Sequence, residues 1–223
     1  MSSQTPTSPQ RRSFMNRFRA GASSVAALAM GSGIAMAKAK APAKGQWEPA
    51  RHKDDDWMDE VPGKHRLVID TTNLEGIQDG LLFASNFILA NRTGYGLQEQ
   101  DVAIIVVARH FSTGFGFNND MWSKYGVTLT PPSPGAEGQG KPPAKANPHS
   151  ESLATLAKQG VRFAVCAMAT HRLAGMIARV NGGNADAIYS ELTANLVTNA
   201  RMVPAGIIAV NRAQERGYSL VTA

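Results

Sequence analysis

The sequence contains very little cysteine, since Cys166 is the only one among 223 residues. A single cysteine excludes an internal disulfide, the Cys-x-x-Cys pairs of zinc and redox sites, and the haem-attachment motif. The sequence also lacks a Walker phosphate loop and the Gly-x-Ser-x-Gly motif of many hydrolases. Sites with strong local signatures are therefore excluded, and the lone thiol becomes the most informative residue.

Acidic residues are absent from the first 37 residues, which hold four arginines. These arginines contribute most of the net charge of +6, because the rest of the chain has 19 basic and 17 acidic residues. That remainder is nearly neutral, and no basic stripe is interleaved with aromatic residues. We therefore expect no binding to nucleic acid.

The amino terminus has the features of an export signal. Arg11-Arg12 is followed by Phe14 and by a mildly apolar stretch rich in Ala and Gly over 20–37. This stretch ends in Ala35-Met36-Ala37, which fits the small-x-small cleavage rule. The pattern predicts a twin-arginine (Tat) signal peptide over 1–37 and a mature protein in the periplasm. A membrane anchor is the alternative, but the stretch is only weakly apolar, and no other run is long enough to span a bilayer.

Two further segments are predicted to lie outside the core. Residues 38–63 are polar, contain three prolines and include Asp54-Asp55-Asp56, so we expect a linker or surface arm with a solvated aspartate loop. Trp47 and Trp57 predict that parts of this arm dock, with a neighbouring subunit as one candidate surface. Residues 127–150 hold six of the 12 prolines and almost no large apolar residue, which predicts a mobile insertion.

Residues 64–223 show apolar patterns that alternate between strands and helices. Asn73 is positioned to cap the first helix, and the apolar run Asp101–Ala108 is typical of a strand buried on both faces. Strands are predicted at 65–70, 101–108, 161–165, 201–203 and 218–222, and helices at 73–91, 119–125, 151–159, 168–180, 185–198 and from Pro204 onward. This alternation predicts one α/β domain with a mostly parallel central sheet.

Four candidate site residues end or follow the predicted strands, at the edge where the carboxyl ends of parallel strands meet. They are Asp70, Arg109, His110 and Cys166. Cys166 also precedes a helix, whose dipole and free N–H groups stabilise a thiolate, and Arg109, His110 or Arg172 would supply positive charge. Asp70 is predicted either to orient His110 or to cap a turn. A loop role for His110 and a buried, inert Cys166 remain alternatives.

Three short segments resemble the DsrE/DsrF-like sulfur-relay family. They are the strand and cysteine at Val161–Cys166 with the following helix, the stretch Val203–Val210 with Gln214–Tyr218, and the first strand His65–Asp70. The resemblance spans about residues 64–223. It implies a three-layer sandwich, a trimer or hexamer, and a sulfane sulfur carried as a persulfide on Cys166.

This resemblance implies transfer to or from a sulfur donor or acceptor protein, with no cofactor and no metal. A site built from Cys166 with His110 or His171 would suit copper, but no paired ligand spacing supports one. Two features depart from the family, because its members are usually intracellular and because the insertion at 127–150 precedes the cysteine strand. A non-catalytic binding or assembly module with an inert cysteine is therefore the alternative.

Overall fold

A computed structural model describes residues 48–130 and 144–223 of the chain. Within these residues, five strands form one sheet in the order β4-β3-β2-β1-β5, and every neighbouring pair is parallel. The strands are β1 (His65–Thr71), β2 (Val102–Ala108), β3 (Arg162–Cys166), β4 (Ala200–Val203) and β5 (Ser219–Thr222). The predicted signal over 1–37 and Trp47 lie outside the described residues.

Helices connect all of these strands. The α-helices are α1 (Leu74–Tyr95), α2 (Asn119–Leu129), α3 (Ser150–Lys158), α4 (Ala167–Asn181), α5 (Ala185–Ala194) and α6 (Gly206–Glu215). Three 3-10 helices also occur, namely η1 (Lys53–Met58), η2 (Glu99–Asp101) and η3 (His110–Gly116). No helix in the described ranges is both long and apolar enough to cross a membrane.

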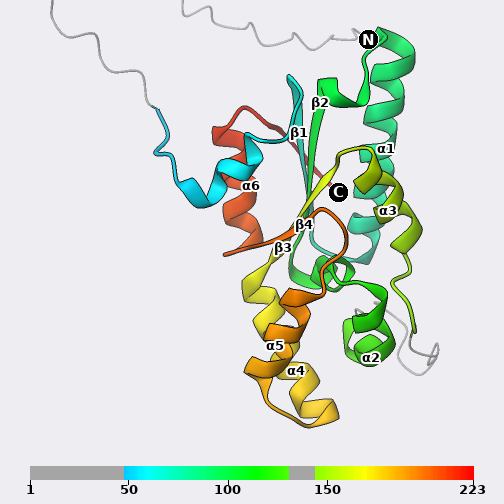
Figure 1. Cartoon of the computed structure of the whole chain (residues 1–223), viewed down its shortest axis with the longest axis vertical. Coiled ribbons are helices and arrows are strands. Elements are labelled where there is room, and N and C mark those ends of the chain that lie inside the picture. The colour runs from blue at the N-terminus through cyan, green and yellow to red at the C-terminus, as the bar shows by residue number, and fades with distance from the viewer. Residues whose placement is uncertain (1–47, 131–143) are drawn as a thin grey trace, which may run out of the picture. The chain divides into compact units, whose positions relative to one another are not determined.

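The order of the strands explains which helices cover which face. The chain moves from β1 through β2 and β3 to β4 in one direction, so right-handed crossovers keep these connections on one face. It then returns across the sheet to β5, which places α6 on the opposite face. Figure 1 shows α1 and α3 on one side of the sheet and α6 on the other. The predicted α/β three-layer sandwich is confirmed.

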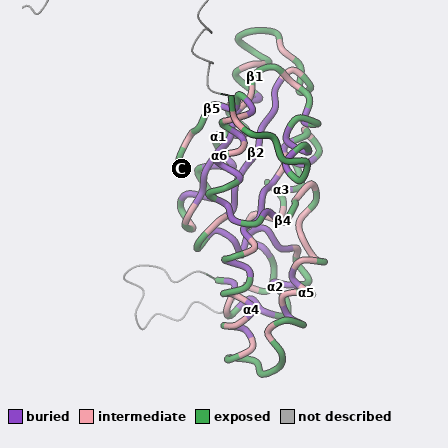
Figure 2. Tube along the Cα trace, turned by 90° about the vertical axis from the view of Figure 1, so that its left-hand side faces the viewer, coloured by how far each residue is buried: buried purple, intermediate pink, exposed green. Residues whose placement is uncertain are grey.

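The two faces have separate apolar cores, because side chains alternate along a strand. Leu67, Ile69 and Ile104 belong to the core with the first five α-helices. Val68 and Ile105 belong to the core with η1 and α6. All seven residues of β2 are buried, as the apolar run predicted, and Figure 2 shows this central strand as a buried segment.

Residues 48–63, the described part of the arm before β1, pack on the core more closely than the sequence indicated. Trp57 and Met58, in η1, are buried in the core below α6. Asp55 is also buried and lies 3.7 Å from Arg212, with its Oδ2 facing the guanidinium Nε. The hydroxyl of Tyr218 donates to the carbonyl of Met58 at 2.6 Å. The expected docking of Trp57 therefore occurs on the protein's own sheet, and the expected solvated aspartate loop is partly buried instead.

Both ends of the 127–150 segment also differ from a mobile insertion. Leu129 is the last residue of α2 and is 2% exposed. Asn147 is 2% exposed, and its side chain donates to the carbonyls of Phe115 and Phe117. These contacts tie the segment's ends to the core, while residues 131–143 lie outside the described residues.

Helix boundaries follow local capping chemistry. Asn73 caps α1 as predicted, because its side chain accepts a hydrogen bond from the N–H of Gly76 at 2.7 Å. The helix α6 begins at Gly206, with Ala205 in extended conformation as its N-cap. Pro204 therefore precedes the helix instead of opening it, and this shift places Ala205 and Gly206 at the carboxyl edge of the sheet.

Candidate functional site at the carboxyl edge

The three central strands bring the candidate residues together at one edge, as the topology predicted. In the register, Thr71 of β1 pairs with Ala108 of β2, and Ala108 pairs with Val165 of β3. Asp70 immediately precedes Thr71, Arg109 follows Ala108, and Cys166 follows Val165. The segment at this edge leads into α4, which extends beyond the sheet with α5 (Figure 1).

Cys166 ends β3 and is the N-cap residue of α4. Its Sγ accepts a hydrogen bond from the backbone N–H of Ala169 at 3.5 Å, and its side chain is largely buried. The hydroxyl of Thr170 donates to the Cys166 carbonyl at 2.9 Å and fixes the turn. The sulfur therefore faces the positive end of a 15-residue helix, where a negative charge is stabilised.

Arg109 is held by a buried carboxylate. Its Nε and Nη2 donate to the two carboxylate oxygens of Asp70 at 2.6 and 2.7 Å, and Asp70 is 4% exposed. These hydrogen bonds raise the pKa of Arg109 above its usual value, against the opposing effect of burial, and the charges of Asp70 and Cys166 add to the rise. Asp70 thus positions Arg109, instead of orienting His110 or capping a turn.

His110 has an unusual backbone conformation, with a positive φ of 58°. Non-glycine residues rarely adopt this left-handed region, so the surrounding contacts must hold it. The N–H of Phe111 donates to the carbonyl of Thr72 at 2.8 Å, and the His110 carbonyl accepts from Nη2 of Arg172 at 3.4 Å. In the described part of the chain, no hydrogen bond joins the His110 ring to Asp70 or Cys166.

A cavity of about 320 Å³ opens at this edge, and we call it the Cys166 cavity. It is lined by Arg109, His110, Cys166, Met168, Ala169, Arg172, Ala205, Gly206 and Ile207. Three of the four predicted site residues line it, and the fourth, Asp70, lies behind Arg109. The contribution of α6 was not predicted from the sequence, because Pro204 indicated an earlier start for the helix that begins at Gly206.

Gly206 allows Arg109 to reach this position. A Cβ atom on Gly206 would lie 2.5 Å from the Cβ of Arg109 and 2.9 Å from its Cδ, which is closer than real carbon contacts allow. The first turn of α6 therefore packs directly on the aliphatic part of the Arg109 side chain. A glycine directly after an N-cap position was the sequence signal that could have revealed this contact.

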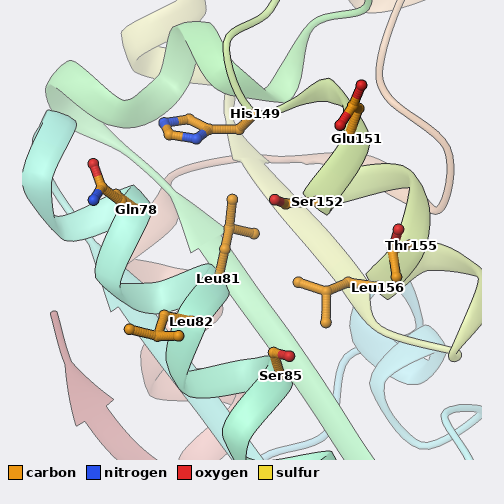
Figure 3. A pocket seen from close by; sticks show the side chains of 9 residues that line it. All are labelled: Gln78, Leu81, Leu82, Ser85, His149, Glu151, Ser152, Thr155 and Leu156. Carbon is orange, nitrogen blue, oxygen red and sulfur yellow. The ribbon is translucent and has the colours of Figure 1, made fainter.

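A larger hollow, of about 500 Å³, lies between α1 and α3, and we call it the α1–α3 hollow (Figure 3). It is lined by Gln78, Leu81, Leu82, Ser85, His149, Glu151, Ser152, Thr155 and Leu156. The His149 Nε2 atom is buried and has no hydrogen-bond partner among the described residues, and burial lowers the pKa of this histidine. Among the described residues, the lining of this hollow has neither a thiol nor an arginine, so it lacks the combination found in the Cys166 cavity.

Metal ligands do not converge anywhere in the described ranges, since no three His, Cys, Asp or Glu side chains are placed to hold an ion. His171, the other histidine considered for a metal site, stacks on Tyr189 with ring centroids 3.6 Å apart. This contact lies away from the Cys166 cavity, whose lining does not include His171.

No model of a known protein family matches the chain. No curated protein matches it either. One similar solved structure is that of a protein of unknown function from Methanobacterium thermoautotrophicum, with 19% sequence identity and a TM-score of 0.40. The match covers 72% of this chain and 100% of that chain. The chemistry of the Cys166 cavity therefore carries the functional proposal.

Proposed function

We propose that this protein carries sulfane sulfur as a persulfide on Cys166. In the loading step, the Cys166 thiolate attacks the outer sulfur of a donor persulfide or polysulfide. A new S–S bond forms to Cys166, the donor's own S–S bond breaks, and its electron pair leaves with the remaining donor thiolate. The reverse step, with an acceptor thiolate, unloads the protein, so the transfer needs no redox cofactor.

The observation that supports this proposal is the position of the Cys166 sulfur between the start of α4 and a fixed cation. A persulfide carries negative charge on its outer sulfur, which would extend from Cys166 into the cavity. Arg109 lines that cavity as a permanent cation, and the N–H of Ala169 donates toward the inner sulfur. Both groups stabilise an anionic sulfur without needing to move.

Burial of Cys166 favours a second candidate function. The residue is only 7% exposed and packs with Ala169 and Ala205. Free cysteine is among the most buried residue types and is often inert. In this alternative, the domain is a non-catalytic binding or assembly module, and the cysteine only fills space beneath the first turn of α4.

One experiment separates the two functions. The native protein is treated with iodoacetamide at neutral pH, and separately with polysulfide, and the added mass is measured on the intact chain. A persulfide carrier is labelled at a rate at least equal to that of a free thiol and gains sulfur, and Cys166→Ser prevents both reactions. Labelling only after denaturation would establish the module instead.

Export and assembly are further parts of the proposal. The twin arginine and the cleavage motif support delivery to the periplasm, and the family resemblance supports a trimer or hexamer that exchanges sulfur with a partner protein. Replacing Arg11 and Arg12 by Lys should retain the precursor in the cytoplasm. Sedimentation at micromolar concentration should show an oligomer, and a compact monomer would contradict the assembly.

A further inference from the structure

The charged side chains that line the Cys166 cavity are all positive. Arg109 comes from the end of β2 and Arg172 from α4, and no carboxylate is among the lining residues. The nearby carboxylate, Asp70, lies behind Arg109 and uses both oxygens in the bidentate pair. Two arginine side chains from separate elements therefore line one space, and no acidic side chain of the described residues lines it.

Both arginines keep N–H groups that no hydrogen bond within the described residues uses, and the Arg172 guanidinium lies 5.5 Å from the centre of the Phe111 ring. Arg109 uses Nε and Nη2 for Asp70, and within the described residues its Nη1 has no hydrogen-bond partner. Arg172 is exposed, and its one hydrogen bond found in the same residues is a long contact of 3.4 Å to the His110 carbonyl. A guanidinium with free N–H groups pairs best with a planar or tetrahedral oxyanion.

Backbone donors at the start of α6 add to this arrangement. The N-cap residue Ala205 has no side-chain group that could cap the helix, and Ala205, Gly206 and Ile207 all line the cavity. The first N–H groups of a helix have no partner inside the helix. The 10-residue helix therefore directs its positive end into the same space as the two arginines.

Apolar side chains form part of the rim of the cavity. Met168 is 70% exposed and Ile207 is 56% exposed, and both line the cavity. The cavity is therefore open to solvent, and a small anion can enter it from there. The cavity volume of about 320 Å³ is also several times the volume of roughly 30 Å³ that one water molecule occupies in the liquid.

We propose that the Cys166 cavity is a binding site for a small tetrahedral oxyanion of the sulfate, thiosulfate or phosphate type, with Arg109 and Arg172 as its charged ligands. The site holds its anion beside the Cys166 sulfur. Binding needs no reaction of the thiol, so this inference goes beyond the persulfide proposal and can succeed or fail independently of it.

Isothermal titration calorimetry tests the site. The full chain is titrated with sodium sulfate, thiosulfate and phosphate, with ionic strength held constant by sodium chloride. Saturable binding with one anion per chain is expected for at least one of them. Tighter binding of the two sulfur anions would identify a sulfur oxyanion as the ligand, and tighter binding of phosphate would identify a phosphate compound. Cys166→Ser should retain sulfate binding.

Two matched pairs of variants locate the binding. Arg172→Ala should weaken it about tenfold, as expected for a lost hydrogen bond to a charged group. Arg179→Ala removes the same charge from the same helix at a residue that does not line the cavity, and should have little effect. Ile207→Glu places a carboxylate on the rim and should abolish binding, whereas Ile208→Glu, one residue further, should not.

The inference is overturned by any of three results. The first is the absence of saturable binding of all three anions at constant ionic strength. The second is equal weakening by Arg172→Ala and Arg179→Ala, which would reflect general surface charge. The third is unchanged binding in Ile207→Glu, because an anion cannot share this small space with a new carboxylate.

Discussion

The Cys166 cavity encloses about 320 Å³ at the carboxyl edge of the sheet, whereas the α1–α3 hollow encloses about 500 Å³ between two helices. The smaller cavity combines a thiol, two arginines and the starts of two helices. The larger one is lined by leucines, hydroxyl groups, one glutamate and a histidine. Volume alone would select the α1–α3 hollow, whereas the topology favours the Cys166 cavity, because parallel strands collect reactive residues at their carboxyl ends and a groove between helices does not.

The strongest test of this comparison moves the thiol from one hollow to the other. Ser152 lines the α1–α3 hollow, so Ser152→Cys in a Cys166→Ser background creates a lone cysteine there. We expect this variant to lose nearly all persulfide uptake, because no arginine lines the hollow. Mass measurement after polysulfide treatment gives the uptake. Equal loading of the transplanted thiol would show that the carboxyl edge confers nothing on Cys166.

The second test removes the carboxylate behind Arg109. Asp70→Asn breaks the bidentate pair and leaves the partly buried Arg109 without its counter-charge. Because Asp70 is 4% exposed, we expect a loss of about 2 to 3 kcal/mol in the free energy of unfolding. Urea denaturation measures it.

Glu151→Gln is the matched control for Asp70→Asn, since it removes a carboxylate from the α1–α3 hollow. Glu151 lies in the first turn of α3, where a negative charge contributes only about 0.5 kcal/mol. If the two variants lose the same stability, Asp70 is no more important than a surface carboxylate, and its positioning of Arg109 has no energetic basis.

The sequence predicted those features of the molecule that depend on residues close together in the chain or on a general rule of the fold. The burial of Val106 and the cap at Asn73 follow from patterns within a few residues, and both were predicted. The convergence of Arg109 and Cys166 was also predicted, because parallel topology alone places strand ends together. In each case the signal was local, or the rule applied to the whole fold.

The features that were missed depend on partners far away in the chain. Trp57 predicted that the arm docks, but the segment rich in aspartate around it gives no local sign that Met58 is buried beside it. Their neighbour Asp55 is placed close to Arg212, and the Met58 carbonyl accepts from Tyr218. In the same way, Asn147 in a proline-rich segment donates to Phe115. Such pairs are separated by 32 to 160 residues, so no local pattern reveals them.

The third test concerns the contact between α6 and Arg109. Gly206→Ala places a Cβ within 2.5 Å of the Arg109 side chain, which forces a displacement at the cavity. We expect a loss of about 1 to 2 kcal/mol in unfolding free energy, together with slower alkylation of Cys166. Gly175→Ala is the control, because the nearest atom to its Cβ is 4.0 Å away, and it should stabilise α4 by about 0.5 kcal/mol. Opposite changes in unfolding free energy for the two variants would sharpen the comparison. If Gly206→Ala also stabilised the protein, that result would contradict the close contact.

The smallest expected effect belongs to the α1–α3 hollow. His149 lies against Phe115, with ring centroids 5.0 Å apart, and its buried Nε2 atom has no hydrogen-bond partner in the part of the chain that the structure describes. Burial disfavours the charged ring, so the pKa of His149 is lower in the folded protein than in the unfolded chain. The contribution to stability is complete above a pH of about 6.5, where the unfolded chain also keeps this histidine neutral.

As the pH falls below that value, the unfolded chain binds the proton first, and stability decreases until the pH has passed the folded pKa. Urea unfolding midpoints of the wild-type protein should therefore fall between about pH 7 and pH 5 by more than those of His149→Phe. The phenyl ring keeps the contact with Phe115 and cannot be protonated, so the difference between the two curves isolates this one group. Parallel curves would show that His149 is solvated in the folded state. The α1–α3 hollow would then be an open groove in which water reaches this histidine.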